Sequence, residues 1–133
     1  MNTRDTIIMQ LRGQAIGTIS LKSSIEESFQ NETLRPILKL QNDLFTAAFL
    51  KYIEKNKIDF EVKTVEAKLV VIDNAIQKDI KFSNTMKGIV IGLFTTEEYA
   101  IYSNNASSIN KRMMSMLLER LKSQVQLFAR VSE

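Results

Sequence analysis

The chain of 133 residues carries a formal net charge of +3, is 44% apolar and 25% charged, and contains neither histidine nor cysteine. These absences exclude a side chain that titrates near neutrality at its ordinary pKa, a thiolate nucleophile, a disulfide and an ordinary zinc site. Any metal would have to be a hard cation such as Mg²⁺ or Ca²⁺ held by oxygen ligands, so we expect no cofactor and do not favour an enzyme.

The first 30 residues have the least regular pattern. We predict a short amphipathic helix from Thr3 to Leu11, then loop or strand from Gln14 to Leu21. Ser23 or Ser24 is expected to cap a brief turn that runs through Phe29. The N-terminus lacks the hydrophobic centre of a secretory signal, so we expect a cytoplasmic location.

The segment from Leu34 to Lys57 predicts a helix, because its apolar residues recur at three- and four-residue steps. Thr33 is the expected N-cap. Pro36 then falls in the first turn, where its missing N–H leaves no intrahelical acceptor unpaired. Three lysines in the last turns complement the negative end of the helix dipole. They are Lys51, Lys55 and Lys57.

Between this helix and the next, Ile58, Phe60 and Val62 alternate with charged residues. A short strand is possible there, but we prefer an extended connector, because an isolated pair of strands is marginally stable. A second helix is expected to begin at Thr64. Its expected buried row is Val65, Leu69, Ile72 and Ile76.

The segment from Lys81 to Phe94 suits either a buried helix or, over Ile89–Ile91, a central strand, and we prefer the helix. Thr95 and Glu98 then form a capping box that starts another helix. Polar residues 104–108 interrupt that helix before a long final one. The residues expected to face inward on the final helix are Ile109, Met113, Met116, Leu117, Leu121, Val125 and Phe128.

The four glycines form two pairs with a spacing of four, Gly13/Gly17 and Gly88/Gly92. On a helix this spacing places both glycines on one face, where a neighbouring backbone can approach closely. We expect such close helix packing at Gly88 and Gly92. Neither pair has the pattern of a nucleotide-binding loop. The apolar run from Gly88 to Phe94 is far shorter than the roughly 20 residues of a membrane span, so no membrane association is expected.

Four carboxylates are the candidates for a hard-metal or acid/base site: Asp73, Asp79, Glu97 and Glu98. Asp73 and Asp79 lie six positions apart, which does not align them on one helix face. Capping explains Glu98 more simply, and Asp79 is expected to end one helix or begin the next.

The positive charge is concentrated at the end of the chain. Residues 1–105 hold 13 basic and 13 acidic residues, whereas residues 106–133 hold five basic residues and two acidic ones. A solvated helix face is the simpler interpretation, and a surface for nucleic acid or an acidic partner is the sharper one. Met114 projects away from the buried row and would belong to that surface if exposed. The candidate partner-binding residues are Lys111, Arg112, Met114, Arg120, Lys122 and Arg130.

Three stretches resemble a group of short bacterial helical proteins that have no assigned activity. They are residues 31–43 (NETLRPILKLQND), residues 79–82 (DIKF) and residues 110–114 (NKRMM), within a resemblance over residues 31–128. Some of these proteins carry the label glyoxalase, which implies a βαβββ metalloenzyme with histidine and glutamate ligands. The chain has no histidine, so the resemblance transfers no functional residue. It does imply that this body is a unit found in other bacteria.

We therefore predict an all-α, single-domain bundle of about five or six helices. Residues 1–30 would form an N-terminal arm and residues 31–133 the bundle. The preferred function is a non-enzymatic interaction or oligomerisation module, with a homodimer formed by the final helix and the arm. The alternatives are nucleic-acid binding through the basic final helix, and an enzyme with a carboxylate-bound metal.

Overall fold

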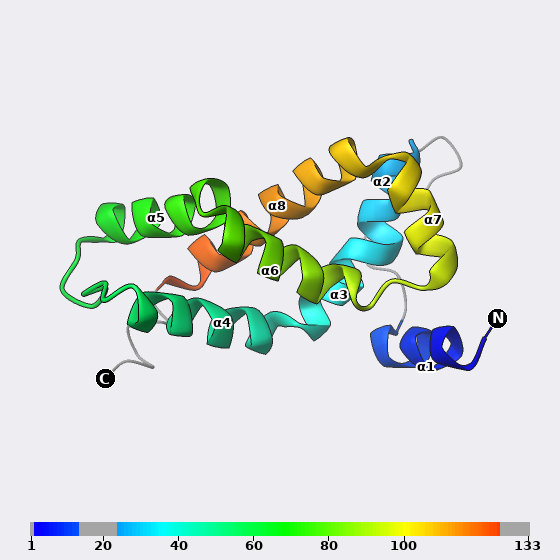
Figure 1. Ribbon diagram of the computed structural model, residues 1–133, viewed down its shortest axis with the longest axis horizontal. Helices are drawn as coiled ribbons and strands as arrows, with labels where there is room; N and C mark the ends of the chain where they lie inside the picture. Colours follow the sequence, from blue (N-terminus) through cyan, green and yellow to red (C-terminus); the bar gives the residue numbers. More distant parts are fainter. Residues whose placement is uncertain (1, 14–23, 126–133) are drawn as a thin grey trace. The chain divides into compact units, whose positions relative to one another are not determined.

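The computed structural model describes residues 2–13 and 24–125, and the described part contains helices and no strand (Figure 1). The all-α class is thus confirmed. None of the described helices is both long and apolar enough to cross a membrane. The predicted loop or strand from Gln14 to Leu21 lies outside the described residues. The elements are α1 (Thr3–Arg12), α2 (Ile25–Phe29), π-helical η1 (Gln30–Leu34), α3 (Arg35–Leu40), α4 (Asn42–Lys55), α5 (Val65–Asp73), π-helical η2 (Asn74–Lys78), α6 (Ile80–Ile91), α7 (Thr96–Asn104) and α8 (Ala106–Ser123).

The chain divides into two compact units. Unit 1 combines Met1–Gln41 with Lys87–Met113, and unit 2 combines Asn42–Met86 with Met114–Glu133. Helices α6 and α8 contribute residues to both. The expected boundary between an arm (1–30) and a bundle (31–133) stays a prediction. Buried apolar residues of unit 1 include Phe29, Leu34, Ile37, Leu38, Phe94, Ile109 and Met113, and those of unit 2 include Phe45, Phe49, Phe60, Ile72, Ile76, Met86, Leu117 and Leu121.

The helix expected to begin after Thr33 begins earlier, at α2. Ser24 is its N-cap, because the Ser24 side chain accepts a hydrogen bond of 3.1 Å from the backbone N–H of Glu27. The prediction that Thr33 caps a helix is wrong. Thr33 lies inside η1 and is buried, and its hydroxyl donates to Glu98 at 2.7 Å.

Pro36 follows a widened helical turn. The backbone N–H of Arg35 donates to the carbonyl of Gln30, five residues back, which is the hydrogen bond of a π-helix. Pro36 has no N–H to donate to the carbonyl of Glu32, four residues back. The Glu32 carbonyl instead accepts a hydrogen bond of 3.1 Å from Nη2 of Arg12. The proline thus leaves a backbone acceptor that a side chain from α1 satisfies.

Helix α5 confirms the expected cap and part of the expected row. The Thr64 side chain accepts from the N–H of Ala67, and residues 58–62 form a connector without a strand. Ile72 and Ile76 are buried, but Val65 is exposed. Lys68 is buried instead, and its Nζ lies 5.5 Å from the centre of the Phe60 ring. This cation–π contact stabilises the buried ammonium group.

Helices α7 and α8 agree closely with the expectations from the sequence. Thr95 and Glu98 form both hydrogen bonds of the capping box at α7. Asn105 separates α7 from α8, whose residues Ile109, Met113, Leu117 and Leu121 are buried as expected, as is Val125 just after its end. Met116 is half-buried, and Phe128 lies outside the described residues.

The close helix packing expected at Gly88 and Gly92 is wrong. Gly88 is exposed on α6, and no described atom lies within 4 Å of a Cβ placed there. A Cβ on Gly92 would lie 3.1 Å from the carbonyl oxygen of Gly88, which belongs to the same helix end. The spacing of four therefore reflects no contact with a second helix in the part of the chain that is described.

We expect Gly88→Ala to raise the free energy of unfolding by about 0.5–1 kcal/mol, because alanine restricts the unfolded chain and favours the helix. Urea denaturation measures this change. Gly13→Ala is the contrasting variant, since Gly13 ends α1 at a φ of +75°. It should lower stability by about 1 kcal/mol. A loss of stability in Gly88→Ala would mean that another group packs on Gly88.

Candidate functional site

Unit 1 is built around a buried guanidinium group. The Arg12 side chain is 1% exposed and forms a two-pronged ion pair with Glu98, whose side chain is 15% exposed. The bond from Nη2 to Oε2 is 2.8 Å long. Arg12 also donates to the carbonyl of Leu93 at 3.3 Å and to that of Glu32 at 3.1 Å. Its Nε has no hydrogen-bond partner within the described part. Arg12 therefore links α1 to η1 and to the start of α7.

Glu98 is fully engaged in this network. Besides Arg12, its carboxylate accepts from the Thr33 hydroxyl at 2.7 Å and from the backbone N–H of Thr95 at 2.8 Å. Burial alone raises the pKa of Glu98. The hydrogen bonds from Arg12, Thr95 and Thr33, together with the charge of Arg12, lower the pKa by more than burial raises it, so the net shift is downward. Glu98 thus stays ionised and has a structural role in this network.

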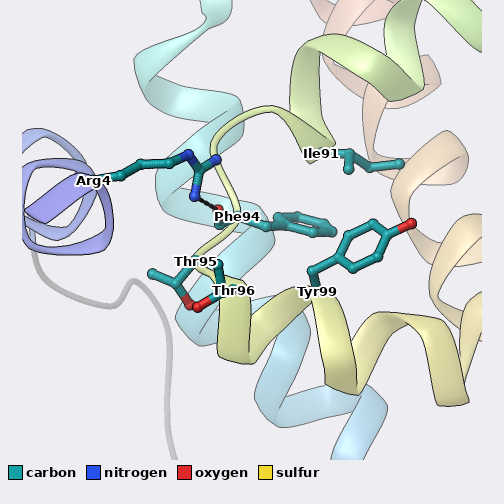
Figure 2. Close-up of a pocket in the computed structure, with 6 residues that line it drawn as sticks. All are labelled: Arg4, Ile91, Phe94, Thr95, Thr96 and Tyr99. Carbon is teal, nitrogen blue, oxygen red and sulfur yellow. Dashed lines mark hydrogen bonds between the residues drawn. The ribbon is translucent and has the colours of Figure 1, made fainter. Parts of the chain in front are cut away.

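A second pair of charged residues on α1 holds the start of α7. Arg4 donates to the carbonyls of Phe94 at 2.9 Å and Gly92 at 3.0 Å, and to Asp5 at 3.0 Å. Asp5 accepts from the hydroxyl of Thr96 at 2.6 Å, which lowers the pKa of Asp5 against the effect of burial. Figure 2 shows Arg4 reaching the Phe94 carbonyl beside a hollow of about 230 Å³. Arg4 is the one charged side chain among the described residues that line this hollow, and it already donates to the backbone between α6 and α7.

A larger hollow of about 410 Å³ lies among α1, α2, η1 and α7. We term it the acidic groove. Its apolar lining comes from Met9, Ile25, Phe29 and Ile101, and its carboxylates include the exposed Glu32 and Glu97. Residues from three separate stretches of the chain create this groove, so no local pattern in the sequence predicts it.

Two predicted arginines on α8 have partners inside their own unit. Arg112 donates to the side chain of Gln30 at 2.8 Å in unit 1. In unit 2, Arg120 donates to Asn42 at 3.2 Å. Each contact uses one of the guanidinium N–H donors that could otherwise donate to a nucleic-acid phosphate.

The other predicted α8 residues differ from one another. Lys122 pairs with Asp73 at 2.7 Å in unit 2. Lys111 is exposed and forms no ion pair with a described residue, and Met114 is half-buried. Arg130 lies outside the described range. Of the five described residues, Lys111 and Arg112 belong to unit 1, and Met114, Arg120 and Lys122 belong to unit 2.

The four candidate carboxylates do not form a metal site within residues 2–13 and 24–125, where no group of three or more potential ligands occurs. Asp73 pairs with Lys122, and Oδ1 of Asp79 accepts from the N–H of Phe82 at 3.0 Å as the cap of α6. Glu97 is exposed beside the acidic groove.

No protein-family model, no curated protein and no solved structure matches the chain.

Because Glu98 holds a buried cation, Glu98→Gln should lower the free energy of unfolding by about 2–4 kcal/mol. Chemical denaturation measures the loss. Glu54→Gln is the matched control, because Glu54 pairs with Lys51 at 3.3 Å on the surface, with side chains 72% and 80% exposed. It should change stability by less than about 0.5 kcal/mol. Equal effects of the two variants would contradict the role assigned to Glu98.

The lowered pKa of Glu98 also predicts a pH dependence. The stability contributed by the ionised group is fully present above its ordinary pKa of 4.5 and is lost as the pH falls through the lower pKa of the folded state. Thermal unfolding from pH 6 down to pH 2.5 should show a steeper loss in the native protein than in Glu98→Gln. Parallel curves would show that Glu98 contributes no such term.

Proposed function

We propose that the protein is a non-enzymatic interaction module that self-associates through the acidic groove, with a homodimer as the simplest product. The main support for this proposal is the exposed apolar surface around the groove. Ile25 is 58% exposed, Met9 40% and Ile101 37%. Covering such side chains removes apolar area from water, which stabilises a complex by about 25 cal/mol for each Å² buried. Clustered exposed apolar residues are typical of contact surfaces.

Charge complementarity favours a second copy of the chain as the occupant. Glu32 and Glu97 give the groove a negative edge, whereas Lys111 is exposed on α8 of the same unit. The net charge of +3 comes from residues 106–133. In a two-fold dimer each contact occurs twice, so one acidic edge and one basic helix per copy form two complementary pairs.

The engaged carboxylates support a non-enzymatic role. Asp73 pairs with a lysine, Asp79 caps a helix and Glu98 holds Arg12, so each has a structural task. The internal contacts of Arg112, Arg120 and Lys122 favour self-association over nucleic-acid binding along α8. A cytoplasmic location remains part of the proposal, and cell fractionation tests it.

Sedimentation equilibrium should show a mass that rises with concentration toward that of a dimer. Ile25→Glu and Ile101→Glu should each weaken association at least about tenfold, because they place a charge in the contact. Val62→Glu is the matched control, since Val62 is 77% exposed and does not line the groove. It should leave association unchanged. A native protein that is monomeric at every concentration would overturn the proposal.

Charge reversal separates the groove from general surface effects. Glu97→Lys and Lys111→Glu should each weaken association, and the double variant should restore it because the pair is exchanged. Failure of the double variant to recover would contradict the pairing of groove and α8.

A further inference from the structure

Unit 2 contains a hollow of about 460 Å³ between α4 and α6 with a basic lining. We term it the basic hollow. Lys51 and Lys55 come from α4, and Lys81 comes from the first turn of α6. All three are exposed. Lys51 pairs only at the surface with Glu54, at 3.3 Å, which is a weak interaction in water. Three ammonium groups are therefore available around one concave site.

Two aromatic rings line the same hollow as these lysines. The centres of the Tyr52 and Phe82 rings are 4.6 Å apart, and the ring planes are tilted by 41°. Both residues line the hollow and are half-buried. Phe49, which is buried, lies 6.2 Å from Tyr52 and 6.5 Å from Phe82, centre to centre. The core thus fixes one side of the two rings while they still contribute apolar surface to the hollow.

Asp79 gives the hollow an acceptor of defined position. Its carboxylate accepts from the N–H of Phe82 at 3.0 Å, which fixes it at the start of α6. Burial, the charge of Asp79 and a hydrogen bond with Asp79 raise the pKa of Tyr52, so the phenol stays protonated. Asp79 is the one carboxylate among the described lining residues. Its remaining oxygen lone pairs can accept from a ligand N–H or O–H group.

We propose that the basic hollow binds a small ligand that carries a planar ring, hydrogen-bond donors and a phosphate, the chemical class of nucleoside monophosphates. The lysines supply point charges for the phosphate, and the Tyr52 and Phe82 rings supply a surface for the planar ring. Asp79 accepts from an amino or hydroxyl group of the ligand. The volume is within the usual range of about 300–1,000 Å³ for small-molecule sites.

Calorimetric titration of the full chain at low salt tests this proposal with three probes: adenosine 5′-monophosphate, adenosine and inorganic phosphate. The monophosphate should bind at least about tenfold more tightly than either part alone, because both halves of the site contribute. No binding of the monophosphate, or equal binding of inorganic phosphate, would overturn the proposal.

Exposed lysines allow variants that keep the fold. Lys55→Ala and Lys81→Ala should each weaken binding of the monophosphate at least about fivefold, through loss of a charged contact. Lys63→Ala, which removes the same charge from unit 2 outside the lining, is the matched control and should bind as the native protein does. Circular dichroism confirms that each variant is folded. Equal weakening in all three variants would indicate a general charge effect and would overturn the site.

A short single-stranded oligothymidylate distinguishes the small ligand from a nucleic-acid strand. It should bind no more tightly than the monophosphate. Tighter binding that depends on Lys55 and Lys81 would overturn the small-ligand proposal in favour of a strand-binding surface. Self-association through unit 1 is measured separately, so either proposal can fail without the other.

Discussion

The ion pair of Arg12 and Glu98 is the interaction on which unit 1 depends. A buried charge without a partner costs several kcal/mol, so neither side chain can occupy its place without the other. Arg12 also satisfies the Glu32 carbonyl that Pro36 leaves without a helical donor. One side chain from α1 thereby binds both the η1 carbonyl of Glu32 and the glutamate of the α7 capping box, whose own two hydrogen bonds are local.

The position of the acidic groove follows from this network. Arg12 and Arg4 lie on the same short helix, and both donate to carbonyls in the segment between α6 and α7. Asp5 accepts two further hydrogen bonds from Thr96, the first residue of α7. Because polar contacts hold α1 at several points, Met9 on the same helix can line the groove while staying partly exposed. The proposed contact surface therefore includes Met9, Ile25 and Ile101, which the fold leaves partly exposed.

Local patterns predicted the helices well, but they did not predict the sites. Thr64 and Thr95 cap helices as expected, since a cap requires only residues within one turn. Thr33 was misassigned as a cap because its partner, Glu98, lies 65 positions away. Gly88 was misassigned because spacing alone does not reveal whether a second helix is present. The predicted surface on α8 treated its cations as available, whereas Arg112 and Arg120 have distant amide partners.

The basic hollow had a partial signal in the sequence. Lys51 and Lys55 lie four positions apart, which places them on one helix face. Lys81 lines the same hollow only because α6 packs beside α4. The expectation that Pro36 leaves no acceptor unpaired is wrong, because the helical segment begins at Ile25, and a proline inside such a segment leaves a carbonyl that needs a donor.

Hydrogen exchange tests the role of Arg12 most directly. In Arg12→Met, which keeps a long apolar side chain but removes the charge, the backbone amides of α1 and of the first turn of α7 should lose most of their protection. Protection in α5 should be retained. Native protection throughout α1 in that variant would contradict the claim that the buried ion pair holds unit 1 together.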